Sequence, residues 1–198
     1  MATTPHRDER LTYDDFLCIP DDGLRHEIID GVHYVTPSPI PWHQVLIGCL
    51  HLALGTFLEA QPHLGHVFLS PLDTVITPWD VVEPDLLVVT GDQSGIVTEP
   101  NIQGAPALVI EVLSPSTRRR DLGIKRDLFD RGGVREYWVV DPTDRSLTVY
   151  RRAADGALTA RPRLMRDEGD VLTTPLLPEF ALSLARLFRP LTSPPPGL

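Results

Sequence analysis

The sequence predicts an α/β (α+β) fold: a mixed β-sheet flanked by helices, with an N-terminal β-hairpin and a C-terminal β-meander. One observation is an apolar run at 107–113, interrupted only by Glu111 and bounded on both sides by proline, which is typical of a buried central strand. A second such run covers 134–140. The stretch between the two runs has a helical pattern, and a strand–helix–strand unit implies a parallel pair with a right-handed crossover.

The N-terminal elements follow from local signals. Residues 11–18 predict a short helix, because Thr12 can serve as its N-cap ahead of two aspartates. Residues 24–36 predict a hairpin, because Asp30-Gly31 suits a type I′ turn, which needs positive φ at both central positions. After three prolines, residues 42–59 predict the longest helix, with apolar side chains at steps of three and four.

The remaining elements are expected from apolar runs and turn signals. Strands are predicted at 66–70, at 73–76 and at 84–89, the last with Asp85 at its start, and a polar loop is predicted at 91–104. The crossover helix can begin at Ser116 or Thr117 and end at Gly132-Gly133. Residues 146–151 and 157–165 predict a hairpin or meander around Asp155-Gly156.

At 198 residues the chain is long enough for one domain with a substantial core. We expect that domain to cover 1–189, with residues 1–10 frayed and a disordered, proline-rich tail at 190–198.

The composition narrows the classes of protein. Two cysteines, Cys18 and Cys49, without CxxC spacing exclude a disulfide scaffold and a cysteine-based zinc site, and they favour a cytoplasmic location. We expect neither a secretion signal nor a membrane helix, because no apolar run approaches about 20 residues. The net charge of −9 argues against a large non-specific DNA-binding surface, although a bound divalent ion would add positive charge at its own site.

Two carboxylates on predicted core strands, Asp85 and Glu111, precede the only candidate lysine, Lys125. Together with their surroundings they resemble the PD-(D/E)XK nuclease superfamily, and more closely its branch of restriction-endonuclease-like proteins called the Uma-two family. The matching pieces are HEIIDG (26–31), EPDLLVV (83–89), PALVIEVLSPST (106–117) and DLGIKRDLFDRGGVREYWVVDP (121–142). The resemblance runs from about Leu24 to Phe188 and implies a restriction-endonuclease-like fold.

The resemblance also implies a metal-dependent endonuclease that hydrolyses DNA phosphodiester bonds. Asp85 and Glu111 would hold one or two Mg²⁺ (or Mn²⁺) ions, with the backbone carbonyl of Val112 as a further ligand. Mg²⁺ prefers such hard oxygen ligands and usually takes one or two carboxylates from the protein. Such an ion polarises the scissile phosphate and lowers the pKa of water.

The lysine departs from the superfamily pattern, which places it two residues after the acid, where this chain has Leu113. Lys125 is the expected substitute, because its spacing from Asp121 and Leu128 puts it on the helix face toward the sheet. There it could orient the attacking water and stabilise developing charge. The requirement is that its ammonium reaches Glu111.

Further candidates come with alternatives. Glu27 is either a third, outer metal ligand or an exposed strand carboxylate, and His43 either meets substrate phosphate or is solvated in the first turn of its helix. Arg118, Arg119 and Arg120 are expected to grip a phosphate backbone, or else are solvated. Asp85 could instead cap a turn, Glu111 could form a structural ion pair with Lys125, and Asp121 is expected to form an ordinary helix pair with that lysine.

Three functions therefore compete. The leading hypothesis is a Mg²⁺-dependent DNA endonuclease, and the main rival is a catalytically inactive binding or interaction protein on the same fold. The third is a metal-dependent hydrolase of another phosphoester. DNA is the expected partner and a membrane is not, while a homodimer that joins two sites stays open. The sequence carries no signature of cleavage specificity.

Overall fold

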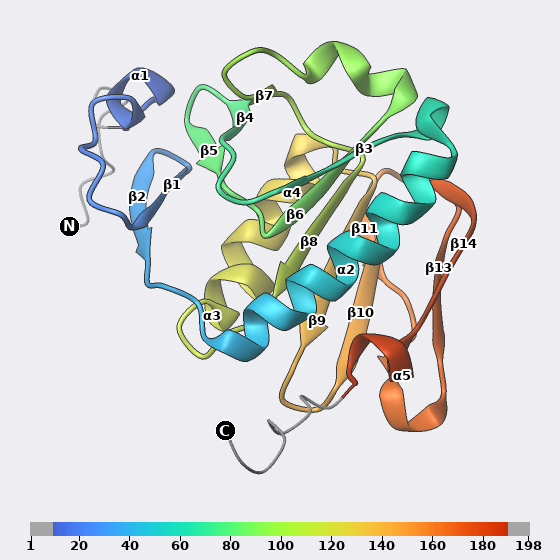
Figure 1. Cartoon of the computed structure of the whole chain (residues 1–198). Coiled ribbons are helices and arrows are strands. Elements are labelled where there is room, and N and C mark those ends of the chain that lie inside the picture. The colour runs from blue at the N-terminus through green and yellow to red at the C-terminus, as the bar shows by residue number, and fades with distance from the viewer. Residues whose placement is uncertain (1–9, 190–198) are drawn as a thin grey trace, which may run out of the picture.

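The computed structural model describes residues 10–189, so residues 1–9 of the frayed start and the proline-rich tail expected from the sequence lie outside the described residues. Its centre is a twisted sheet with the strand order β11-β10-β9-β8-β6-β3, to which β12 adds by pairing with β10 (Figure 1). The strands of this sheet are β3 (Gly65–Leu69), β6 (Leu86–Thr90), β8 (Leu108–Val112), β9 (Glu136–Asp141), β10 (Ser146–Arg152), β11 (Leu158–Ala160) and β12 (Leu164–Met165).

The predicted crossover unit is confirmed. Strands β8 and β9 pair in parallel, whereas the other pairs of this sheet are antiparallel, so the sheet is mixed. The connecting helix is continuous but changes pitch: α3 (Arg118–Arg120) passes into a π-helical turn at Asp121–Lys125 and then into α4 (Arg126–Gly132). Gly133 ends it with φ of 91°, a left-handed conformation that glycine adopts without a steric penalty.

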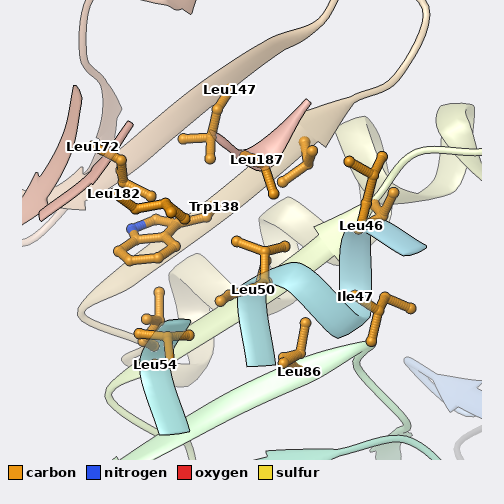
Figure 2. Packing of buried hydrophobic residues seen from close by; sticks show 14 of the residues in the cluster. Leu46, Ile47, Leu50, Leu54, Leu86, Trp138, Leu147, Leu172, Leu182 and Leu187 are labelled. Atoms are coloured by element: carbon orange, nitrogen blue, oxygen red, sulfur yellow. The ribbon is translucent and has the colours of Figure 1, made fainter. Parts of the chain in front are cut away.

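One face of the central sheet is covered by α2 (Pro41–Ala60) and by the C-terminal part of the chain (Figure 1). Leu46, Leu50 and Leu54 recur at four-residue steps on α2 and are fully buried against the sheet, where Trp138 is their largest neighbour (Figure 2). The C-terminal elements are β13 (Val171–Thr174), β14 (Leu177–Ser183) and α5 (Leu184–Leu187).

The opposite face is covered by α4 and by a second sheet. Val109 of β8 packs there with Leu128 and Phe129 of α4, and Ile29 closes the same apolar cluster. The second sheet has the order β2-β1-β5-β4-β7. Its strands are β1 (Arg25–Ile29), β2 (Val32–Thr36), β4 (Thr74–Thr77), β5 (Asp80–Val82) and β7 (Ile102–Gln103), and α1 (Tyr13–Phe16) packs on its outer side.

The local predictions at the N-terminus are confirmed. Asp30 and Gly31 both have positive φ, 53° and 76°, between β1 and β2, as the hairpin turn requires. Thr12 and Asp15 form a reciprocal capping box at the start of α1.

Four features of the fold differ from the expectation. Residues 91–104 are not a plain loop, since a 3-10 turn at Gly91–Ile96 and the short strand β7 lie within them. Strand β5 was not predicted. The C-terminal strands β13 and β14, which form a sheet of their own, were not predicted either. Asp85 lies one residue before β6 instead of inside the strand.

Helix α2 bears on the expectation that no apolar run of the chain is long enough to form a membrane helix. Its 20 residues and mean hydropathy of 1.2 would allow it to cross a bilayer by length and composition alone. However, six of its side chains are buried on the protein side, so we assign it as a core helix.

Replacing Leu50 by alanine should lower the free energy of unfolding by about 2–5 kcal/mol, because it opens a cavity between α2 and the sheet. Leu52→Ala is the matched control on the same helix, since Leu52 is 59% exposed and should change stability by less than about 0.5 kcal/mol. Urea unfolding followed by circular dichroism measures both. Equal losses for the two variants would show that α2 does not pack as described.

Candidate active site

The pleat of the central sheet places Glu111 and Asp85 on the same face. Leu108, Ile110 and Val112 point to the α2 side of β8, so Glu111 points to the α4 side. Leu86 of β6 pairs with Ile110, which brings Asp85, one residue earlier, directly opposite Glu111. The backbone N–H of Asp85 donates to Glu111 Oε2 at 3.5 Å.

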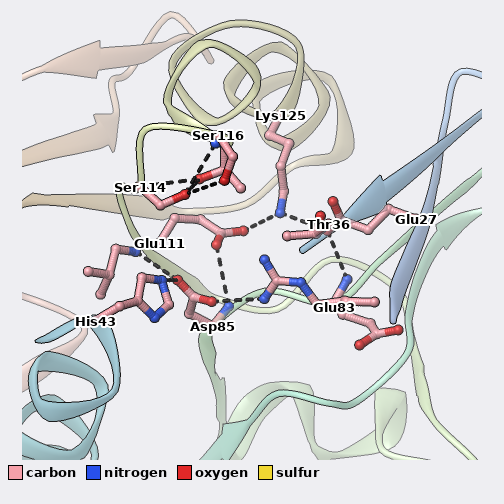
Figure 3. A network of polar contacts seen from close by, with 12 residues as sticks. Glu27, Thr36, His43, Glu83, Asp85, Glu111, Ser114, Ser116 and Lys125 are labelled. Carbon is pink, nitrogen blue, oxygen red and sulfur yellow. Dashed lines mark hydrogen bonds and ion pairs between the residues drawn. The ribbon is translucent and has the colours of Figure 1, made fainter. Parts of the chain in front are cut away.

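Asp85 accepts three donors and is 2% exposed. Its Oδ2 accepts from the Val112 N–H at 2.8 Å and lies 3.1 Å from Nε2 of His43, while its Oδ1 accepts from Arg25 Nη1 at 2.9 Å (Figure 3). Burial alone would raise the pKa of Asp85, but the His43 contact and the Arg25 charge outweigh it and hold the pKa below its usual range. Asp85 is therefore an ionised carboxylate.

Lys125 is the only lysine in the sequence and is 1% exposed. It projects from the π-helical turn, with its ammonium against Glu111 Oε1 and 2.8 Å from Glu27 Oε1 (Figure 3). Burial lowers the pKa of Lys125, yet the charges of Glu111 and Glu27 overcome that effect and raise it. The amine therefore holds its proton despite being buried. The predicted contact between Lys125 and Glu111 is present.

Glu27 comes from the facing strand β1 and is 1% exposed, so it is not the exposed carboxylate of the alternative. Its Oε1 also accepts from the Glu83 N–H at 3.2 Å, and its Oε2 lies 3.7 Å from Arg120 Nη1. Burial opposes ionisation, but Lys125 and Arg25 keep the pKa of Glu27 below its ordinary value. We call Arg25, Glu27, Asp85, Glu111 and Lys125 the charged cluster.

The pKa of Glu111 is shifted in the opposite direction from those of Asp85 and Glu27. Burial raises its pKa well above the ordinary value, Lys125 lowers it, and the adjacent charges of Asp85 and Asp121 raise it again. Asp121 is itself 2% exposed, and burial raises its pKa as well. Five buried carboxyl groups counting Glu83 thus surround the cations of this site, so acid is in excess.

A cavity of about 810 Å³ opens onto the charged cluster. Asp85, Arg25 and His43 line its inner end, and Glu83 lines it as well. Burial raises the pKa of Glu83 to about 7, and the nearby carboxylate of Asp73 adds to that effect. Hydroxyl groups form another part of the wall. At the start of the crossover helix, the Ser114 hydroxyl shares hydrogen bonds with the hydroxyls of Ser116 and Thr117.

The structure brings together five of the residues singled out from the sequence: Glu27, His43, Asp85, Glu111 and Lys125. His43 is buried against Asp85 rather than solvated. The three consecutive arginines diverge. Arg118 pairs with Asp141 at 2.6 Å, Arg119 is exposed, and Arg120 turns inward to Glu27 and to Thr36.

Two residues of the site escaped the sequence reasoning. Arg25 precedes Glu27 by two positions on β1 and therefore shares its face, which was a usable signal. Glu83 stands directly before the Pro84-Asp85 pair but has no pattern of its own. For Val112, the backbone N–H is the group that contacts Asp85. Its carbonyl remains a predicted ligand.

The donor set suits a hard divalent cation. Asp85 offers carboxylate oxygens at the inner end of the cavity, and Glu111, whose Oε1 contacts the Lys125 ammonium, lies directly opposite Asp85. Within residues 10–189, no three His, Cys, Asp or Glu side chains gather closely enough to enclose an ion. Mg²⁺ needs only one or two protein carboxylates, since it keeps several waters.

A family model identifies the family of the chain, and a solved structure supports its fold. A family model, Uma2, described as "Putative restriction endonuclease", matches residues 13–185 of the chain. The crystal structure of a putative nuclease belonging to DUF820, from Anabaena variabilis, matches with a TM-score of 0.73 and 22% sequence identity. The match covers 90% of this chain and 97% of that one. No curated protein matches the chain significantly.

Replacing Lys125 by methionine should lower the free energy of unfolding by about 3–5 kcal/mol at neutral pH, because Glu27 and Glu111 lose their buried counter-charge. Without the ammonium, burial raises the pKa of both acids, so the deficit should shrink as the pH falls and they take up protons. Urea unfolding at pH 5 and pH 8 tests this. Arg126→Met, at the next position, is the control. A small, pH-independent loss in Lys125→Met would contradict the buried ion-pair network.

Glu83→Gln should stabilise the protein as the pH rises. In the wild type the folded pKa of about 7 exceeds the unfolded pKa, so stability falls between the two values as the unfolded carboxyl ionises first. The glutamine variant lacks this loss and should be about 1–2 kcal/mol more stable than wild type at pH 8, after allowance for solvent screening, and equal to it near pH 4. Glu59→Gln, at an exposed position, should show no such trend. A flat difference across the pH range would rule out a perturbed Glu83.

Proposed function

Because the chain belongs to the Uma2 family, whose members are described as putative restriction endonucleases, we propose that it is an endonuclease that hydrolyses DNA phosphodiester bonds with Mg²⁺ or Mn²⁺. The observation that carries the proposal is the sole lysine, buried between two carboxylates behind a cavity whose inner end is lined by a third. A charged amine so deep in a protein is costly, and a role in stabilising charge on a reacting phosphate accounts for it.

The excess of acid over base supports a cation site. The carboxyl groups of Glu27, Asp85 and Glu111 lie beside three cations, which are Arg25, Arg120 and Lys125. Glu83 and Asp121 add two further carboxyl groups to the same site. Because like charges in a buried site repel strongly, a divalent ion at Asp85 and Glu111 would relieve that repulsion.

The roles of the residues follow from their contacts. Asp85 and Glu111 would hold the ion, with the Val112 carbonyl as a further ligand, and His43 fixes the orientation of Asp85 through Oδ2. When bound, the ion supplies Lewis-acid charge at the phosphate and lowers the pKa of a water molecule. Lys125 keeps its proton and donates hydrogen bonds to the attacking water or to a phosphate oxygen, while Glu27 holds the ammonium in place.

Arg25 has a second role in this proposal. Its guanidinium lies at the inner end of the cavity and pairs with Asp85. Were Asp85 to bind an ion, the Arg25 guanidinium would be free to bind a phosphate oxygen, for which its planar donors are well suited.

The rival function is a nuclease-like binding protein without activity. One observation favours it: Asp85, Glu27 and Glu111 all contact a protein cation, so the charged cluster is already balanced in part without an ion. On that account divalent ions would neither bind nor matter.

Calorimetry and nicking together separate the two functions. We expect the wild type to bind Mn²⁺ and Asp85→Asn to lose that binding. With Mg²⁺, wild type should cleave a supercoiled plasmid or a single-stranded DNA circle, and Glu111→Gln and Lys125→Met should be slower by at least about 100-fold. Glu59→Gln, remote from the cavity, is the control and should match wild type. Absent Mn²⁺ binding, or cleavage that persists unchanged in both variants, would favour the inactive protein.

A further inference from the structure

The depth of the charged cluster restricts what can reach it. Asp85, Glu111 and Lys125 are each at most 2% exposed, and the approach to Asp85 is a partly open cavity of about 810 Å³. A base-paired duplex is a stiff rod with its phosphates on the outside, and such a rod cannot enter a cavity of that size. A single strand can, because its backbone bends and its bases can separate.

The solvent-facing walls of the cavity are largely apolar, with Asp21, Ser38, Gln44 and Ser116 as exposed polar exceptions. Ile40 is 54% exposed, Leu24 46% and Leu69 39%, and prolines at 37, 39, 71 and 115 extend the same lining. Unpaired bases have two apolar faces that gain from such contacts, whereas the bases of a duplex are stacked on one another and unavailable. The lining thus fits bases better than it fits the charged exterior of a duplex.

The positive charge that lines the cavity suits the binding of one phosphate group rather than of many. Arg25 supplies the only ammonium or guanidinium group among the residues that line the cavity. Most arginines in residues 10–189 already pair with carboxylates of the same molecule. Duplex binding depends on many unpaired cations along the backbone, and the chain carries a net charge of −9.

We propose that this site takes an unpaired DNA strand, with Arg25 on a phosphate and the apolar walls around Ile40 and Leu69 on the bases, in preference to an intact duplex. The inference rests on the proposed function, which it deepens by naming the substrate class. Binding can be tested apart from cleavage.

Fluorescence anisotropy of the full chain with Ca²⁺ in place of Mg²⁺ provides the test, using labelled oligothymidylate and a hairpin duplex of equal nucleotide number. We expect oligothymidylate to bind at least about tenfold more tightly than the duplex. Ile40→Ser and Leu69→Ser should each weaken its binding about three- to tenfold. Leu52→Ser is the matched control, since Leu52 is 59% exposed on α2 outside the cavity and should leave binding unchanged. All three are surface positions, and a thermal melt confirms that each variant folds.

The outcomes distinguish the preference for an unpaired strand from the proposed endonuclease activity. Duplex binding as tight as strand binding, no binding of either probe, or equal behaviour of the wall variants and Leu52→Ser would each overturn the inference. Metal-dependent nicking that persists alongside tight duplex binding would overturn the strand preference alone. A retained strand preference without any nicking would overturn the hydrolysis and support the binding site.

Discussion

The contact between one ammonium and two carboxylates constrains the rest of this molecule. Lys125 can be charged and buried only because Glu111 and Glu27 meet it from two different sheets. That requirement fixes three distances at once: from the crossover helix to β8, from the helix to β1, and from β1 to the segment between β5 and β6, where the Glu83 N–H donates to Glu27. The second sheet is therefore part of the site and not an appendage to the fold.

The backbone geometry determines where the side chains of the site point. The alternation of β8 sends its apolar residues to α2 and its one carboxylate to the crossover helix, so the same strand serves the core and the site. The π-helical turn at Asp121–Lys125 widens the helix where the lysine leaves it, and such turns occur often at functional positions. Asp85 lies one residue before β6, where its side chain lines the cavity and accepts a hydrogen bond from the Val112 N–H.

Much of this arrangement follows from local patterns in the sequence. The apolar runs around Glu111 and Trp138 and the Asp30-Gly31 turn predict their local structure correctly, because each depends on near neighbours. A helix around Lys125 was also expected, but its π-helical turn at Asp121–Lys125 was not. The burial of His43 did not follow, since it depends on how α2 lies across β6. Arg25 and Glu83 join the site through contacts between segments about 60 and 56 residues apart in the chain, and no local pattern encodes those.

The most direct test of the account uses the fact that Lys125 is the only lysine. Protein labelled with ¹³C-lysine should give one lysine signal in an NMR spectrum, and that signal should not titrate near pH 10.4, the value of an exposed lysine. Small additions of paramagnetic Mn²⁺ should broaden it selectively, and Asp85→Asn should abolish the broadening. A signal that titrates like a solvent-exposed amine, or that Mn²⁺ leaves sharp, would contradict a cation site beside a buried lysine.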